Sequence, residues 1–123
     1  MMGYQLSLWR MSRHAQAYAV LGSGGIRRPV SLRRVDAAPE GERVMDEGVA
    51  RELVHMLQSV VAEGGTAQRA GVMGYQVSGK TGTAWKASEQ GGYSTNKYMA
   101  VFGGVVPASN PRLAAVVVID EPS

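Results

Sequence analysis

The chain has no cysteine, so neither disulfide bonds nor thiolate metal sites are available to it. Its only two histidines, His14 and His55, stand far apart without an accompanying carboxylate pattern, which argues against a metal centre. No stretch approaches the ~18 apolar residues of a membrane span, and no signal peptide opens the sequence. We therefore expect a soluble chain that has no metal site and no transmembrane segment.

An excess of charge of one sign is also lacking, and aromatic side chains are few. Thirteen Lys and Arg residues against ten Asp and Glu give a net charge of +3, and aromatic residues make up 7% of the chain. Because the basic residues are scattered along the sequence, a nucleic-acid interface is not expected. By contrast, 45% of the 123 residues are hydrophobic and sixteen are glycine, which fits one globular domain with many turns.

Hydrophobic periodicity predicts an α+β fold, with helices packed on an antiparallel sheet. The best helix follows Asp46, which can cap it, and apolar residues recur at helical spacing from Val49 to Val60. The apolar segment 114–119 follows a turn at 107–111 and completes a C-terminal three-stranded meander. The expected helices span about 13–22 and 46–62, with a helical turn at 66–70, and the expected strands about 30–35, 75–84, 98–106 and 113–119.

Two patterns in the glycine-rich centre resemble catalytic motifs but have the wrong surroundings. The segment Gly74–Thr81 matches the phosphate-loop pattern G-x-x-x-x-G-K-[ST], which requires a helix starting after the lysine and threonine. The sequence after Thr81 is instead strand-like and then rich in glycine. Ser94–Lys97 matches S-x-x-K and S-x-N, yet Thr95 and Asn96 are poor helix formers at the entry to a strand. A nucleotide-binding module nevertheless stays open as an alternative.

The run Lys80-Thr81-Gly82-Thr83 has surroundings that agree with a mechanism. On a strand, the side chains of Thr81 and Thr83 share one face, while Lys80 and Gly82 share the other. The glycines at 79 and 82 leave room for the main chain of a ligand to lie alongside. Lys80 can hold a carboxylate, and the backbone N–H of Thr83 is a candidate oxyanion donor. These residues therefore predict a peptide-binding ledge.

The order of segments resembles the C-terminal part of the transpeptidase domain of class B penicillin-binding proteins, above all the division-type branch, penicillin-binding protein 3. The resemblance covers nearly the whole chain, which would form part of a single domain over 1–123. The matching stretches are Gly3–Ser7, Gln16–Leu21, Gly64–Thr66, Gly79–Thr83, Pro107–Arg112 and Val116–Ser123.

The family uses three motifs, S-x-x-K, S-x-N and K-[TS]-G. The resemblance assigns the third to Lys80, Thr81 and Gly82, with Thr83 following, as the residues that bind substrate or β-lactam. Tyr93 and Tyr98 resemble aromatics that border the family's site. Ser94–Lys97 follows K-T-G and so lies on the wrong side to be either earlier motif. The chain is thus expected to lack the catalytic serine and its lysine and to be inactive alone.

For the parent enzyme, the resemblance implies a peptidoglycan D,D-transpeptidase that cross-links stem peptides through an acyl-serine, is a β-lactam target and needs no cofactor. It also implies an inner-membrane anchor, a periplasmic domain and divisome partners. Two departures stand out: residues 8–14 differ from the family's helix entry, and no covering helix follows Ser123. We expect apolar surface on Val116–Ile119 to be masked by self-association or by the missing N-terminal part of the domain. A strand-binding scaffold and a serine β-lactamase segment are the further alternatives.

Overall fold

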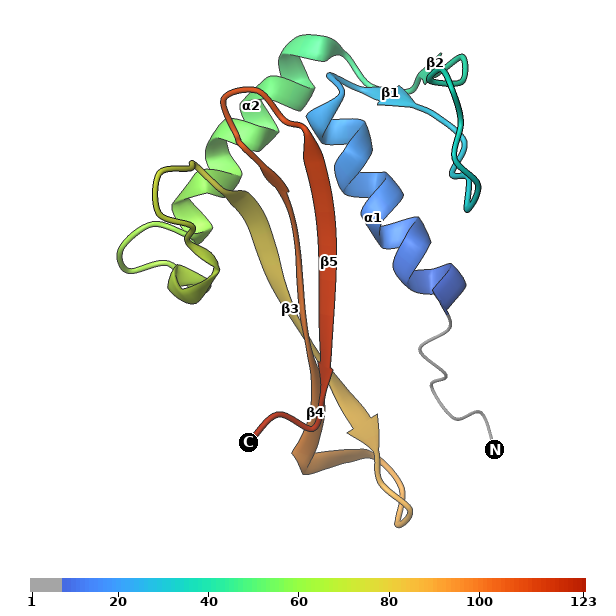
Figure 1. Cartoon of the computed structure of the whole chain (residues 1–123). Coiled ribbons are helices and arrows are strands. Elements are labelled where there is room, and N and C mark those ends of the chain that lie inside the picture. The colour runs from blue at the N-terminus through green and yellow to red at the C-terminus, as the bar shows by residue number, and fades with distance from the viewer. Residues whose placement is uncertain (1–7) are drawn as a thin grey trace.

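Two α-helices and a three-stranded antiparallel sheet make up the body of the molecule (Figure 1). The structure, a computed structural model, describes residues 8–123. Both helices pack against the same face of the sheet, which confirms the predicted α+β class with a C-terminal meander. In chain order the elements are α1 (Leu8–Gly22), β1 (Ile26–Arg27), β2 (Glu42–Arg43), α2 (Glu47–Leu57), the 3₁₀ segments η1 (Gln58–Val60) and η2 (Gln68–Ala70), β3 (Ser78–Ala87), β4 (Tyr93–Val106) and β5 (Leu113–Asp120).

The sheet has the order β3-β4-β5, so β4 lies in the middle. Lys80 of β3 pairs with Gly103 of β4, which in turn pairs with Val116 of β5. A Cβ atom on Gly103 would lie 2.2 Å from Cε2 of the Tyr18 ring. The glycine therefore lets α1 approach the middle of the sheet closely.

A small core lies where the helices meet one end of the sheet. Its buried members are Val54, Val105 and Ala108, and Tyr18, Leu21 and Ala114 pack against them. The hydroxyl of Ser78, which is 1% exposed, donates a hydrogen bond to the carbonyl of Val54. This bond joins the start of β3 to α2 and fixes the strand that carries the candidate ledge.

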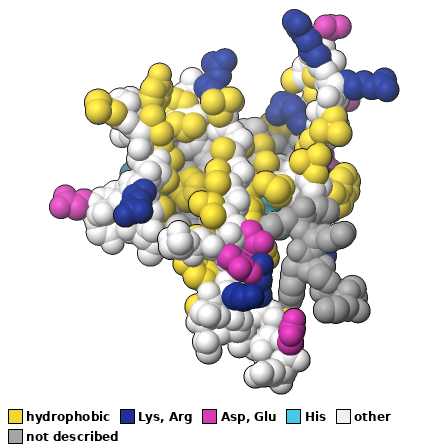
Figure 2. Space-filling view, turned by 60° about the horizontal axis from the view of Figure 1, so that its bottom comes forward, with side chains coloured by type: hydrophobic (Ala, Val, Ile, Leu, Met, Phe, Trp, Pro, Cys, Tyr) yellow, Lys and Arg dark blue, Asp and Glu magenta, His cyan; other side chains and the backbone are white. Residues whose placement is uncertain are grey.

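The opposite face of the sheet carries exposed apolar side chains. Val117 and Ile119 of β5 are 52% and 54% exposed. In the view of Figure 2, hydrophobic side chains gather in the upper and central part of the molecule, and several charged side chains project at its margins. In the described part of the chain, no helix is long and apolar enough to span a bilayer.

The prediction of a strand over residues 30–35 is wrong. This segment is an exposed loop, in which Leu32 is 90% exposed. The Ser31 hydroxyl donates to the carbonyl of Arg33 and accepts from its N–H, so local bonding replaces a strand ladder. The short strands β1 and β2 pair with each other on either side of this loop.

Other boundaries shift in ways that the structure explains. Helix α1 begins at Leu8, although the sequence places its start near residue 13, and the guanidinium of Arg13 lies 5.3 Å from the centre of the Trp9 ring one turn away. The predicted long second helix ends at Leu57 and continues as the 3₁₀ turn η1. Strand β4 starts at Tyr93, five residues before the expected start at residue 98. The matching stretch Gly3–Ser7 lies outside the described residues.

Candidate functional site

The segment Lys80–Thr83 lies in the middle of β3, in extended conformation. These residues pair in sequence with residues 103 to 100 of β4, and β3 is an edge strand of its sheet. Lys80, Gly82 and Thr83 are exposed and Thr81 is half-buried. The stretch therefore has the geometry that a peptide-binding ledge requires: an extended main chain at an accessible margin of a sheet.

The ammonium group of Lys80 folds back onto its own strand. Its Nζ donates to the carbonyl oxygen of Thr81 over 2.9 Å. Toward α1, a hollow of about 260 Å³ borders the same segment, and His14, Tyr18 and Val116 contribute to its lining. Burial raises the pKa of the Tyr18 phenol above its ordinary value of 10.0. The ammonium-bearing Lys80 and the phenol of Tyr18 thus border an open space beside the strand, whose remaining lining is largely apolar or glycine.

On the other face of β3, the hydroxyl of Thr81 has a partner from a distant part of the chain. Its Oγ1 lies 3.0 Å from Oγ1 of Thr66, in the segment between η1 and η2. Thr66 is not among the site residues that the sequence predicts. The glycines at 64 and 65 just before it were the available signal, because they mark a turn that could be shaped for a tertiary contact.

The sequence predicts room for a ligand beside both Gly79 and Gly82, but the structure leaves that room only beside Gly82. A Cβ on Gly79 would lie 2.4 Å from Cζ of Phe102, so the space beside Gly79 is filled by that ring. A Cβ on Gly82 would lie 3.9 Å from Cβ of Val101, which is an ordinary van der Waals contact. Only Gly82 of this pair leaves room for a ligand. Gly79 instead allows internal packing.

The aromatic residues Tyr93 and Tyr98 lie on β4 in the hairpin beyond the ledge. The Tyr98 ring packs against Trp85 with centroids 5.3 Å apart and planes tilted by 55°. Tyr93 pairs with Ala87 at the end of the hairpin and is 73% exposed. Trp85 shares its face of β3 with Thr81 and Thr83, so the structure adds an aromatic residue to the two that the sequence predicts near the site.

The far end of the sheet is held by an ion-pair cluster. Nζ of Lys86 lies 2.7 Å from Oδ1 of Asp120 and 2.8 Å from Oε1 of Glu121. Hydrogen bonds to Asp120 first and Glu121 second raise the pKa of Lys86 above its ordinary value of 10.5. This cluster ties β3 to the end of β5 beyond the ledge.

The two rival motifs do not have the geometry that their chemistry needs. Lys80 and Thr81 lie inside β3, which runs on to Ala87, so no helix begins at Thr81 to bind phosphate. Ser94–Lys97 lies inside β4 rather than on a helix, where S-x-x-K would bring serine and lysine together. The Ser94 hydroxyl donates to the side chain of Asn96. Among the described residues, no cluster of metal-binding side chains is present.

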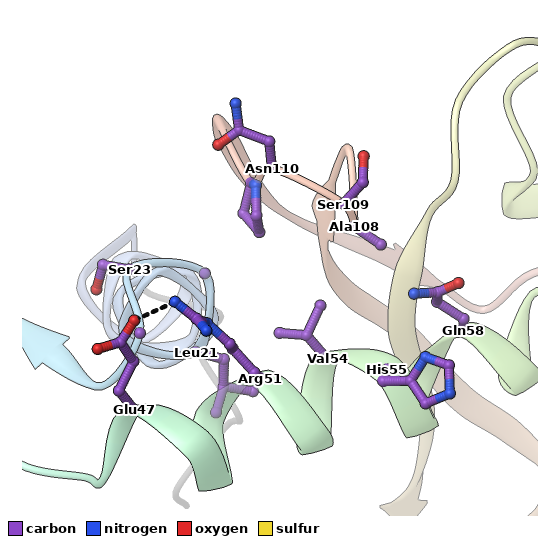
Figure 3. A pocket seen from close by; sticks show the side chains of 13 residues that line it. Leu21, Ser23, Glu47, Arg51, Val54, His55, Gln58, Ala108, Ser109 and Asn110 are labelled. Carbon is purple, nitrogen blue, oxygen red and sulfur yellow. Dashed lines mark hydrogen bonds and ion pairs between the residues drawn. The ribbon is translucent and has the colours of Figure 1, made fainter.

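A larger hollow of about 520 Å³ lies elsewhere, between the end of α1, α2 and the β4–β5 turn (Figure 3). Arg51, which projects into it, is already paired with Glu47, and His55 and Gln58 lie along its side. None of the residues 80–83 lines it. Of these two hollows, the smaller one beside β3 is the better candidate for the Lys80 side of the site, because it borders Lys80–Thr83. The side chains of Thr81 and Thr83 lie on the other face of β3.

Comparison with known sequences places the chain in a family. Residues 11–123 match the model of the penicillin-binding protein transpeptidase domain. Peptidoglycan D,D-transpeptidase FtsI of Escherichia coli is 49% identical over 108 residues, which cover 88% of this chain and 18% of that protein. The probable peptidoglycan D,D-transpeptidase PenA of Neisseria meningitidis is 43% identical over 121 residues, covering 98% of this chain and 20% of that protein.

Solved structures show the same architecture. The transpeptidase domain of Burkholderia pseudomallei penicillin-binding protein 3 matches with a TM-score of 0.80 and 43% identity, over 88% of this chain and 33% of that one. Penicillin-binding protein 3 of Mycobacterium tuberculosis in complex with ampicillin matches with a TM-score of 0.75 and 32% identity, over 88% of this chain and 28% of that one. The chain thus spans about a fifth of the length of the curated relatives, 18–20%. It belongs to the penicillin-binding protein transpeptidase family, of the class B, penicillin-binding protein 3 type.

Proposed function

We propose that the chain carries the substrate-binding strand of a division-type peptidoglycan D,D-transpeptidase and forms the C-terminal part of a single transpeptidase domain. The observation that supports this most directly is the placement of Lys80–Thr83 in extended conformation on an exposed edge strand. The enzyme that contains it cross-links stem peptides of the cell wall. β-Lactams are inhibitors of this enzyme, since they acylate the serine that attacks the stem peptide.

In this proposal the ledge binds and orients the substrate but breaks no bond. Lys80 attracts the carboxylate of the stem peptide, and Thr81 and Thr83 donate hydrogen bonds to it. The backbone N–H of Thr83 faces the carbonyl oxygen, where negative charge develops during acyl transfer. The attacking serine and its lysine come from a segment outside this chain. No cofactor is required.

The location and partners of the parent enzyme follow from the family and are part of the proposal. The parent is anchored in the bacterial inner membrane, its transpeptidase domain lies in the periplasm, and it works with proteins of the division machinery. Tyr93 and Tyr98 border the site on the hairpin beyond the ledge.

The test is to supply the missing part of the site. In the transpeptidase domain of Burkholderia pseudomallei penicillin-binding protein 3, the segment that matches this chain is replaced by the chain itself. The preceding part of that domain is kept. We expect fluorescent penicillin to label the joined protein covalently, and Lys80→Ala to slow labelling by about a hundredfold, as when a stabilising group is removed from an acyl-transfer site. Lys97→Ala, on β4, is the matched control and should label at the normal rate.

The chain alone should remain unlabelled, because no serine within residues 8–123 has a lysine one helical turn away on a helix. An adduct on Ser94 of the isolated chain would contradict the proposal. So would a joined protein that folds, as judged by a cooperative melting transition, yet is labelled equally with and without Lys80. Peptide binding to the chain that is insensitive to Lys80→Ala would favour a strand-binding scaffold instead.

A further inference from the structure

Thr66 contacts Thr81 of the ledge, which follows it by fifteen residues. Its Oγ1 lies 3.0 Å from Oγ1 of Thr81, and either hydroxyl can be the donor. A hydroxyl has one proton and two lone pairs. The direction of this hydrogen bond therefore decides whether Thr81 offers a ligand a donor or an acceptor.

The backbone on both sides of Thr66 is fixed by the fold. A Cβ on Gly65 would lie 2.2 Å from the carbonyl oxygen of Val60, so this position accepts only glycine. On the other side, the N–H of Ala67 donates to the same carbonyl over 2.9 Å, and Ala67 is 8% exposed. Thr66 is thus held between two tightly constrained neighbours. This constrained backbone places the exposed side chain of Thr66 beside Thr81.

We propose that Thr66 is a positioning residue that selects carboxylate ligands at the ledge, an inference that rests on the proposed function. Thr66 donates its proton to Oγ1 of Thr81, and Thr81 in turn donates its own proton to the carboxylate. A carboxylate can only accept hydrogen bonds, so it requires this direction. In such a series of hydrogen bonds each bond polarises the next, and the last bond ends on a charged acceptor.

The opposite direction makes a different prediction. If Thr81 donated to Thr66, its lone pairs would face the ligand and would suit the N–H groups of a carboxamide. Discrimination between a carboxylate and a carboxamide on the same peptide therefore reports the direction of the Thr66–Thr81 bond. A role of Thr66 in folding alone would change the binding of both ligands equally.

The experiment uses the full chain and two peptides, N,N′-diacetyl-L-lysyl-D-alanyl-D-alanine and its C-terminal carboxamide. Binding is followed by NMR through the backbone amide signals of Thr81 and Thr83. For Thr66→Val, which keeps the branched shape and removes the hydroxyl, we expect the affinity for the acid to fall about fivefold, as for loss of a hydrogen bond between two neutral groups. Affinity for the carboxamide should not change. Thr66→Ser, the matched control, should bind both peptides as the unmodified chain does.

The outcomes separate this inference from the proposed function. If Thr66→Val lowers the affinity for both peptides equally, or for neither, Thr66 does not select carboxylates and the inference fails. This holds whether or not fluorescent penicillin labels the joined protein. The inference is also overturned if the unmodified chain binds neither peptide. A dispersed amide spectrum verifies that each variant is folded, and Thr66→Ala replaces the valine variant if that one is not.

Discussion

Gly79 and Gly82 are the same residue type on the same strand, but their surroundings differ. A side chain at Gly79 would meet Cζ of Phe102 at 2.4 Å and the carbonyl oxygen of Gly103 at 2.7 Å. A side chain at Gly82 would meet only Cβ of Val101, at 3.9 Å. The glycines flanking a ligand-binding motif therefore need not share a function. One makes the strand pack, and the other keeps the site open.

This difference predicts opposite effects of alanine at the two positions. Gly79→Ala should lower the free energy of unfolding by about 1–3 kcal/mol, because backbone and ring atoms must move to admit the methyl group. Gly82→Ala should leave stability unchanged or raise it by up to about 1 kcal/mol, since alanine restricts the unfolded chain more than glycine does. Urea denaturation of both variants measures this. Equal destabilisation by the two substitutions would show that the packing of Phe102 against Gly79 is not important.

At the scale of the elements, local signals decide which segments the sequence predicts well. Asp46 before an apolar periodic segment predicts helix α2, and Oδ1 of Asp46 accepts hydrogen bonds from the N–H groups of Gly48 and Val49 at 2.8 and 3.2 Å. The alternating segment 30–35 fails as a strand because Ser31 bonds locally and the apolar side chains have no facing layer. The contact of Thr66 with Thr81 is tertiary, and no local pattern specifies it.

The junction of β3 with the end of β5 predicts a particular dependence on pH. Asp120 and then Glu121 raise the pKa of Lys86 in the folded chain above 10.5. A lysine whose pKa is higher in the folded state stabilises that state fully below the unfolded pKa, and this contribution disappears as pH rises through the folded value. Lys86→Met should therefore melt at a lower temperature than the unmodified chain at neutral pH. The gap should close only above pH 10.5.

Lys97→Met provides the matched control, because Lys97 is an exposed lysine on the neighbouring strand β4. It should melt as the unmodified chain does across the same range. Raising the salt concentration should also narrow the gap for Lys86→Met, because the carboxylates that contact Lys86 are partly exposed. A gap that stays constant through the alkaline range would exclude the ion-pair cluster as its source.

For the whole molecule, the outer face of the sheet raises the question of what covers it. The helices pack on one face only, while Val117 and Ile119 on the other are about half exposed. The chain spans 18% of the length of the Escherichia coli relative. In a protein of that length, other segments are the expected cover of this face. In isolation, an apolar sheet face of this kind favours association with a second copy.

We therefore predict that the isolated chain self-associates through this face. Sedimentation velocity over a range of concentrations should show a species heavier than the 13.1 kDa monomer. Replacing Val117 and Ile119 together by threonine should weaken association, because threonine keeps the strand propensity and removes apolar area. Leu32→Thr removes a side chain that is 90% exposed in the loop between β1 and β2, and it should leave association unchanged. If the double variant associates as strongly as the unmodified chain, the outer face of the sheet is not the contact, and the open edges of β3 and β5 become the surfaces to test.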